Sequence, residues 1–231
     1  RLGSRVRIPS RAFFFSNISG NTKTKTHMPE LVCAFFVFNF DGGFYGTNLF
    51  RKKYHDLLTN KLYKGITLYY EIVGYVDENT LIMPECNNKK VKDKEFEKVY
   101  GETTKFTYSC SPGENEMYVY RMTLTTPDDL VLEVPYETMK IYCEQIGVKV
   151  VPLLEKFLFT TKEDLLERVD KYMDIPDPIG KSHVAEGVVV RIENRVKFTA
   201  FKQKGWFFKV LEGIIKDEEQ APDMEEAQEI E

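Results

Sequence analysis

Cysteine and histidine are scarce in this chain, and their scarcity limits the disulfides and metal sites that it can form. Its 231 residues include four cysteines and three histidines, namely Cys33, Cys86, Cys110, Cys143, His27, His55 and His183. No two cysteines form a C-x-x-C pair and the histidines are dispersed, so the ligand spacing of a zinc site is missing. Scattered cysteines are typical of reduced, buried thiols, and we therefore expect an intracellular, cytoplasmic protein.

Long apolar runs and a strong net charge are missing as well. The longest apolar run, LVCAFFVFNF at residues 31–40, has the length of a strand. It falls short of the about 18 apolar residues that a membrane-spanning helix needs, so we expect no contact with a membrane. The net charge of -4 argues against binding nucleic acid over the whole surface, and any such contact is expected at a local patch.

Acidic residues are missing from the first part of the chain, and basic residues from its last part. Residues 1–27 resemble a mitochondrial transit peptide in composition, but the first methionine is Met28. We interpret residues 1–27 as a non-native or disordered leader and exclude them from the fold. Residues 217–231 hold acids and no base, which is typical of a solvated acidic tail. We predict one folded domain over residues 28–216.

What is present is an ordinary globular composition, with 42% hydrophobic and 29% charged residues. Hydrophobic patterns predict strands at residues 31–40, 66–75, 116–124, 186–192 and 197–202, and further extended chain at residues 148–159. They predict helices at residues 51–62 and 136–146, the latter ended by Gly147, and one from a capping box at Thr160 and Glu163 through about residue 172. Residues 86–102 are polar and are interpreted as a surface insertion. Because strands dominate and short helices cover them, we predict an α+β fold with mostly antiparallel sheets.

Two motif-like stretches are interpreted as ordinary loops. The sequence IGKS at residues 179–182 is similar to the end of a P-loop, but Ile175 stands where that motif requires glycine. His183 stands alone near Glu186, and we interpret it as a loop histidine rather than a ligand or base.

Two lysines near the C-terminus raise the question of an anion site. Lys202 and Lys204 are two residues apart in a predicted strand, so they point to the same face. Like charges repel unless water covers both or an anion lies between them. One interpretation is a solvated edge strand, since lysine guards strand edges against aggregation. The other is a site for a phosphate group.

Other strands also carry groups that a core does not need. Glu71 lies in the middle of an apolar strand, where an unpaired carboxylate is costly, so it needs a cation, a metal or hydroxyl donors. Tyr118 and Tyr120 share one face of the next strand, and a flat ring is a good platform for a purine. Glu186 opens EGVVVR, where Gly187 allows another backbone or a ligand to approach closely. With the two lysines, these residues are compatible with a nucleoside triphosphate site.

The order of these stretches resembles a known family. LYYEIVGY, MYVYRM, EGVVVR and FKQKGWFFKVLEG, in this order, resemble motifs III, IIIa, IV and V of the covalent nucleotidyltransferases. Within that superfamily they are most similar to the RNA ligases of the second type found in phage T4. The resemblance covers roughly residues 42–216. It implies a nucleotidyltransferase (ATP-grasp-like) ligase fold and an ATP-dependent RNA ligase that serves RNA repair.

The resemblance implies a role for each matching residue. Glu71 would meet the ribose hydroxyls, and Tyr120 would stack on adenine. Lys202 and Lys204 would contact the α-phosphate, and Glu186 would help to organise Mg²⁺ or the lysine nucleophile. Such enzymes use ATP and Mg²⁺ to join RNA 5′-phosphate and 3′-OH ends through lysyl-AMP and RNA-adenylate intermediates.

This chain departs from the family pattern at two places. Arg121 stands where the family usually has an aspartate after the stacking aromatic residue. Motif I, K-x-[acid or His]-G, is missing upstream of Glu71: FNFDGG at residues 38–43 has no lysine, and KVYG at residues 98–101 lies in the wrong order. We interpret Lys98 as a surface residue. We therefore expect a domain that is incomplete at its N-terminus and that does not form lysyl-AMP.

Two other function classes stay open. A capping enzyme or a DNA ligase shares the motifs, but no OB-fold follows motif V in this sequence. A non-catalytic nucleotide- or RNA-binding protein would explain the missing lysine.

Overall fold

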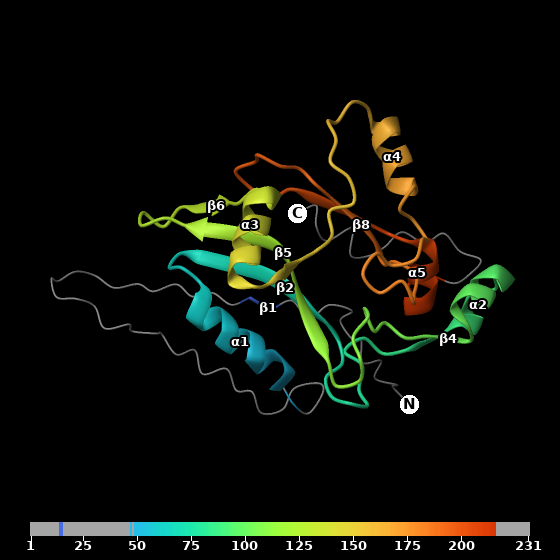
Figure 1. Cartoon of the computed structure of the whole chain (residues 1–231). Coiled ribbons are helices and arrows are strands. Elements are labelled where there is room, and N and C mark those ends of the chain that lie inside the picture. Colours follow the sequence, from blue (N-terminus) through green and yellow to red (C-terminus); the bar gives the residue numbers. More distant parts are fainter. Residues whose placement is uncertain (1–13, 16–46, 48, 216–231) are drawn as a thin grey trace, which may run out of the picture. The chain divides into compact units, whose positions relative to one another are not determined.

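The computed structural model describes residues 14–15, 47 and 49–215. These residues form a mixed α+β structure in two compact units, which confirms the predicted class (Figure 1). Unit 1 takes in the described residues up to Ile72 together with Met117–Val151. Unit 2 takes in Val73–Glu116 and the described residues from Pro152 onward. The predicted leader at 1–27, the acidic tail at 217–231 and the predicted strand at 31–40 lie outside the described residues, apart from the short β1.

Unit 1 is a sheet with helices on one face. Its elements are β1 (Phe14–Phe15), α1 (Leu49–Lys61), β2 (Ile66–Gly74), β5 (Asn115–Thr125), β6 (Val131–Glu133), α3 (Tyr136–Ile146) and β7 (Lys149–Val150). The strand order is β1-β2-β5-β6, and β7 pairs with β5 off this path. The β1–β2 and β5–β6 pairs are antiparallel, whereas β5 and β7 are parallel. The last residues of β2 and the first of β5 belong to unit 2.

The core of unit 1 lies between this sheet and the helices α1 and α3 (Figure 1). Leu58 on α1 and Met139 on α3 pack with Leu68 on β2 and Val119 on β5. The predicted bounds of α3 are confirmed, because its apolar residues face this core and Gly147 ends it in the left-handed conformation, at φ 74°.

Unit 2 contains two small antiparallel sheets and short helices. Its elements are β3 (Cys86–Asn87), the 3-10 helix η1 (Asn88–Lys90), α2 (Lys94–Tyr100), β4 (Thr103–Thr104), α4 (Lys162–Asp170), β8 (Gly187–Arg191), β9 (Ala200–Lys204) and α5 (Trp206–Glu212). Strand β3 pairs with β4, and β8 pairs with β9. A second core gathers Phe96, Phe106, Val184, Phe208 and Leu211.

Several boundaries differ from the sequence prediction. The helix predicted from a cap at Thr160 is α4, which begins one residue later because Thr161, not Thr160, accepts the capping hydrogen bond from the Asp164 amide. Residues 151–161 form no strand. Residues 86–102 lie mostly at the surface, as interpreted, but the segment folds into β3, η1 and α2 and buries Phe96 to 3% exposure. None of the described helices is long and apolar enough to span a membrane.

Candidate functional site

The two lysines of the predicted anion site lie on an antiparallel ribbon formed by β8 and β9. Lys204 pairs with Gly187 and Lys202 with Val189, so both lysines are on one face of this β8–β9 ribbon. The side chain of Lys202 is 13% exposed and that of Lys204 is 3% exposed. The interpretation as a solvated edge strand is therefore wrong, because neither ammonium group is covered mainly by water.

Gly187 sets the close approach of the two strands. Its φ of 140° lies in a region that L side chains rarely adopt, and a Cβ atom here would lie 2.0 Å from the Gln203 carbonyl oxygen. The Gly205 amide also donates to the Glu186 carbonyl oxygen at 2.8 Å. The group that packs closely against Gly187 is thus the backbone of β9. The hydrogen bond from Gly205 fixes Glu186 beside the end of that strand.

Glu186 and Lys202 form an ion pair that is too long to include a hydrogen bond from the lysine. Lys202 Nζ lies 3.8 Å from Glu186 Oε2, which is beyond hydrogen-bond distance. This Nζ atom is buried and has no hydrogen-bond partner in the part of the chain that the structure describes. The other carboxylate oxygen, Glu186 Oε1, accepts from the Tyr108 hydroxyl at 2.9 Å. Because an ammonium group without hydrogen bonds is costly to bury, this geometry favours an additional acceptor at Lys202.

Lys204 has a different environment at the other end of the same face. Its ammonium group donates to Glu212 Oε2 at 3.2 Å, and the two side chains are only 3% and 9% exposed. Glu212 is the last residue of α5. The pair therefore ties β9 to the end of the following helix, and an internal carboxylate already neutralises Lys204.

His183 lies in the core of unit 2 behind this group. It is fully buried, and its ring centroid lies 5.1 Å from that of Phe106 and 4.6 Å from that of Tyr108. Its Nδ1 atom is 3.0 Å from the Val184 carbonyl oxygen, so a proton on Nδ1 donates there. Nε2 has no hydrogen-bond partner among the described residues. His183 does lie in a loop, as predicted, but it is buried and its ring packs against Tyr108.

The other two predicted site residues belong to unit 1. Tyr120 lies half-buried on β5, and its ring centroid is 6.4 Å from that of Tyr69, at an interplanar angle of 51°. Glu71 is half-buried on β2 and, by alternation, shares a face with Tyr69. The opposite face of these strands packs in the core through Leu68 and Val119. The aromatic and acidic groups therefore lie on the face of the sheet that the helices leave uncovered.

Arg121, the first departure from the family pattern, has a structural partner. Its Nε atom donates to both carboxylate oxygens of Glu133 at 3.1 Å, and its guanidinium carbon lies 4.4 Å from the centroid of the Tyr69 ring. Burial opposes the charge, yet the hydrogen bond and the charge of Glu133 raise the pKa of Arg121 above its ordinary value. This position thus supplies a cation that pairs β5 with β6, and it cannot supply a metal ligand.

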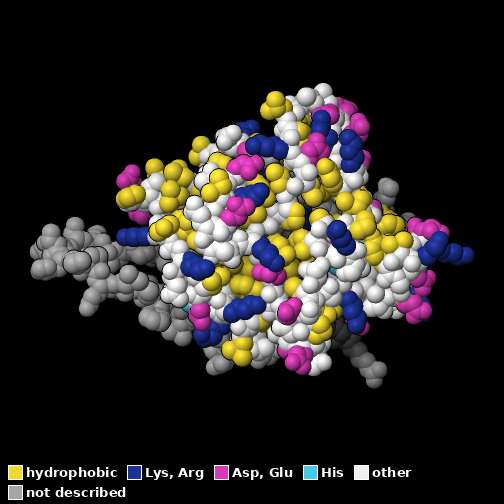
Figure 2. All heavy atoms as spheres, in the orientation of Figure 1, with side chains coloured by type: hydrophobic (Ala, Val, Ile, Leu, Met, Phe, Trp, Pro, Cys, Tyr) yellow, Lys and Arg dark blue, Asp and Glu magenta, His cyan; other side chains and the backbone are white. Residues whose placement is uncertain are grey.

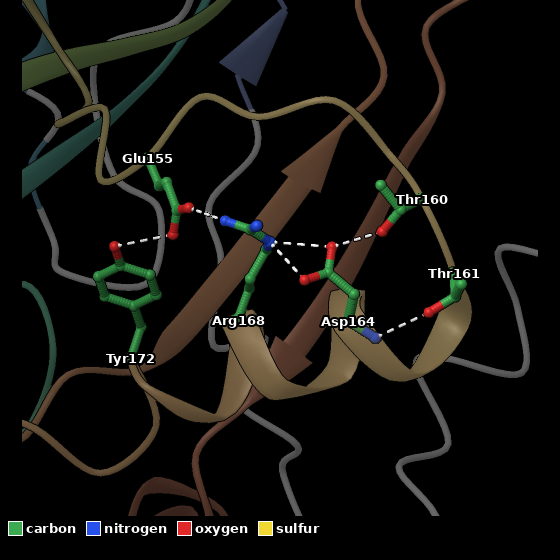
Figure 3. A network of polar contacts seen from close by, with 6 residues as sticks. All are labelled: Glu155, Thr160, Thr161, Asp164, Arg168 and Tyr172. Carbon is green, nitrogen blue, oxygen red and sulfur yellow. Dashed lines mark hydrogen bonds and ion pairs between the residues drawn. The ribbon is translucent and has the colours of Figure 1, made fainter.

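A second polar network surrounds α4 in unit 2 (Figure 3). Arg168 donates from Nε to both oxygens of Asp164 at 3.1 Å and also pairs with Glu155. Tyr172 donates to the second oxygen of Glu155 at 3.2 Å, and Thr160 donates to Asp164 at 2.8 Å. Figure 2 shows acidic and basic side chains mixed over this helix. Each charge has an opposite partner here, so the network holds the loop before α4 and is no candidate site.

Magnesium is the metal that the resemblance implies, and Glu186 is its predicted ligand. Among the described residues, no three His, Cys, Asp or Glu side chains are close enough to hold a metal ion. Mg²⁺ is commonly bound by one or two carboxylates, phosphate oxygens and water. Glu186 fits this pattern only if a bound nucleotide supplies the remaining ligands.

The structure therefore divides the five predicted site residues between the two units. Glu186, Lys202 and Lys204 gather on the β8–β9 ribbon of unit 2, whereas Glu71 and Tyr120 lie on the sheet of unit 1. Lys98 lies on α2 with its side chain 76% exposed, in agreement with its interpretation as a surface residue. A scan of the sequence against models of protein families finds no match, and a search of the curated proteins finds no relative.

Proposed function

We propose that this chain is an ATP-dependent RNA ligase domain with a nucleotidyltransferase (ATP-grasp-like) fold, which joins RNA 5′-phosphate and 3′-OH ends. The observation that carries the proposal is the environment of Lys202. A buried ammonium group faces a carboxylate at 3.8 Å and has no hydrogen bond within the described residues. A phosphate group supplies both the negative charge and the acceptor oxygens that such a lysine needs.

The neighbouring residues support a phosphate at this position rather than a second carboxylate. Glu186 already supplies one carboxylate, of which Oε1 accepts from the Tyr108 hydroxyl while Oε2 stays 3.8 Å from the Lys202 ammonium nitrogen. A lysine in a shielded place stabilises negative charge more strongly than one in water, because the local dielectric constant is lower. This is the environment that transfer of an adenylyl group requires at its α-phosphate.

The proposed roles follow the motif resemblance. Lys202 contacts the α-phosphate, whereas Lys204, to which the resemblance gives the same contact, is already paired with Glu212. Glu186 would help to hold Mg²⁺, which would neutralise charge on the phosphates. For Glu71 and Tyr120 in unit 1, the resemblance alone implies contacts with the ribose and the base. In the sealing step, the RNA 3′-oxygen attacks the adenylated 5′-phosphate. A new phosphodiester bond forms, the anhydride bond to AMP breaks, and the 3′-OH proton passes to solvent.

One alternative is a nucleotide- or RNA-binding protein without catalysis, and a specific observation favours it. This sequence holds no K-x-[acid or His]-G motif upstream of Glu71, so no residue here takes the place of the lysine nucleophile in the family order. We expect that α-labelled ATP and Mg²⁺ leave no labelled protein band after denaturing electrophoresis. A band that disappears on Lys98→Ala would instead assign the nucleophile to Lys98.

An RNA that already carries AMP on its 5′-phosphate separates the two functions, because it bypasses the lysine nucleophile. The chain is incubated with this RNA, a 3′-OH acceptor RNA and Mg²⁺, without ATP. The proposed ligase seals the two strands and releases AMP. Lys202→Gln lowers the sealing rate about tenfold or more, since a hydrogen-bonded charge is lost. Lys197→Gln, at an exposed position in the turn between β8 and β9, leaves the rate unchanged.

The result assigns the function in each case. If the chain binds ATP but never seals the adenylated RNA, the binding protein is the correct class. If it neither binds ATP nor seals RNA, both functions are wrong.

A further inference from the structure

Tyr108 is held in an unusual backbone conformation next to the candidate site. Tyr108 and Ser109 both have positive φ angles, 50° and 63°, in a turn closed by a hydrogen bond from the Cys110 amide to the Thr107 carbonyl oxygen at 2.9 Å. Residues other than glycine rarely adopt such angles, and their cost persists only where the surroundings fix them. The Ser109 hydroxyl donates to the Ile179 carbonyl oxygen at 3.1 Å and anchors the turn.

The Tyr108 ring is fixed as firmly as its backbone. The residue is 8% exposed and belongs to the core of unit 2 with Phe106. The buried His183 ring meets it edge-on, with 4.6 Å between the ring centroids and an interplanar angle of 70°. A ring with a fixed backbone and a buried wall has little freedom, so its hydroxyl group has a defined position.

The same carboxylate, that of Glu186, faces both this hydroxyl group and Lys202. Glu186 Oε1 accepts from Tyr108 at 2.9 Å, while Oε2 remains 3.8 Å from the ammonium nitrogen. An ammonium–carboxylate pair with full contact has its atoms about 2.7–2.9 Å apart. The two charged groups are thus close enough to attract each other, yet they do not form a hydrogen bond.

We propose that Tyr108 is a positioning residue: its hydroxyl group holds the Glu186 carboxylate away from Lys202, so that the lysine keeps its N–H donors for an anionic ligand. That this ligand is a nucleotide phosphate rests on the proposed function. Without the hydroxyl group, Glu186 turns toward Lys202 and neutralises it. An anion then has to displace an internal carboxylate before it binds.

The test uses ATP as the probe, in EDTA so that no metal contributes, and compares Tyr108→Phe with Tyr172→Phe. Tyr172 is a matched control in the same unit, because its hydroxyl group also donates to a glutamate, Glu155 Oε2 at 3.2 Å (Figure 3). We expect Tyr108→Phe to raise the Kd for ATP about tenfold and Tyr172→Phe to leave it unchanged. Equal effects of the two variants would overturn the proposal.

A second comparison separates positioning from stability. If Tyr108 acts through the charge of Glu186, then Tyr108→Phe has no further effect on the Kd in a Glu186→Gln background, because a neutral amide does not neutralise Lys202. If the hydroxyl group serves only folding, the effect of Tyr108→Phe is the same in both backgrounds. That additive result would contradict the proposal.

A structure of unliganded Tyr108→Phe tests the geometry without any ligand. We expect the distance between Lys202 Nζ and Glu186 Oε2 to fall from 3.8 Å to hydrogen-bond length. If wild-type protein does not bind ATP and the pair closes in the variant, the proposed function fails while the role of Tyr108 stands. If wild-type protein binds ATP and the pair stays open in the variant, the role of Tyr108 is wrong and the function stands.

Discussion

Unit 2 contains two groups of charged side chains, and they differ in how many of their hydrogen-bond donors have partners. Around α4, Arg168 contacts both Glu155 and Asp164, and these carboxylates also accept from Tyr172 and Thr160, respectively (Figure 3). On the β8–β9 ribbon, Lys202 is more deeply buried than Arg168 but has no hydrogen bond within the described residues. A network that serves structure uses its donors internally, whereas Lys202 keeps its donors available.

The same contrast divides the two ribbon lysines. The Lys204 ammonium nitrogen lies 3.2 Å from Glu212 Oε2, whereas that of Lys202 lies 3.8 Å from Glu186 Oε2. The other oxygen of Glu186, Oε1, accepts a hydrogen bond from Tyr108. Two lysines on the same face of one strand therefore differ: Lys204 is hydrogen-bonded to a carboxylate, and Lys202 has no hydrogen bond within the described residues. The predictions below test this difference, from the largest expected change to the smallest.

Lys204→Met is expected to lower the free energy of unfolding by about 3–5 kcal/mol, because it leaves the nearly buried Glu212 without its cation. Urea unfolding measures the change. The double variant Lys204→Met with Glu212→Leu should recover most of the loss, since a buried pair replaced by apolar residues is close to neutral. No recovery would show that Lys204 stabilises the fold by another route.

Gly187→Ala is expected to destabilise the ribbon by about 3 kcal/mol, from an unfavourable φ and from overlap with the Gln203 carbonyl oxygen. Gly213→Ala is the matched control, because Gly213 also has a positive φ, 76°, but has open space around its Cβ position. The control should lose only about 1 kcal/mol. Equal losses in thermal or urea unfolding would mean that close strand approach is not what requires Gly187.

The α4 network should give the smallest change, visible only in acid. A hydrogen bond from Arg168, and a second from Thr160, lower the pKa of Asp164 below its usual value of 3.8. A carboxyl group with a lowered pKa stabilises the fold above about pH 4 and loses that contribution as the pH falls through its folded-state pKa. Arg168→Met should therefore flatten the loss of stability below about pH 4.

The control for this effect is Lys140→Met, which breaks an exposed pair with Glu144 at 4.0 Å. Its pH profile between about pH 2 and pH 5 should match that of the wild type, because a well-exposed pair contributes little. An identical acid profile for Arg168→Met would contradict the assigned cause of the Asp164 shift.

Local patterns predicted those parts of the fold that depend on neighbours in the sequence. The bounds of α3 followed from its apolar face and from Gly147, and alternation placed Lys202 and Lys204 on one face. The predicted second strand of the ribbon, residues 197–202, was shifted because the turn between β8 and β9 is longer than expected, and β9 runs over Ala200–Lys204.

Long-range contacts explain what the sequence did not reveal. Residues 86–102 looked like a surface segment because they are polar, yet the Phe96 ring packs 4.5 Å from that of Phe207. Tyr108 was not predicted as a site residue, since its partner Glu186 lies 78 positions away and no motif surrounds the tyrosine. The burial of both ribbon lysines also depends on distant residues, so alternation alone could not separate a solvated edge from a shielded site.

The measurement that tests the central claim most directly is the affinity for ATP of three variants, Lys202→Gln, Lys204→Gln and Lys197→Gln, beside the wild type. Hydrogen bonds to charged groups contribute about 1.5–3 kcal/mol, so Lys202→Gln should weaken binding roughly tenfold to a hundredfold. Lys197→Gln should change neither binding nor the unfolding midpoint, whereas Lys204→Gln should lower the midpoint clearly. If Lys202→Gln binds ATP as tightly as Lys197→Gln and the wild type, Lys202 is not an anion site and the account is wrong.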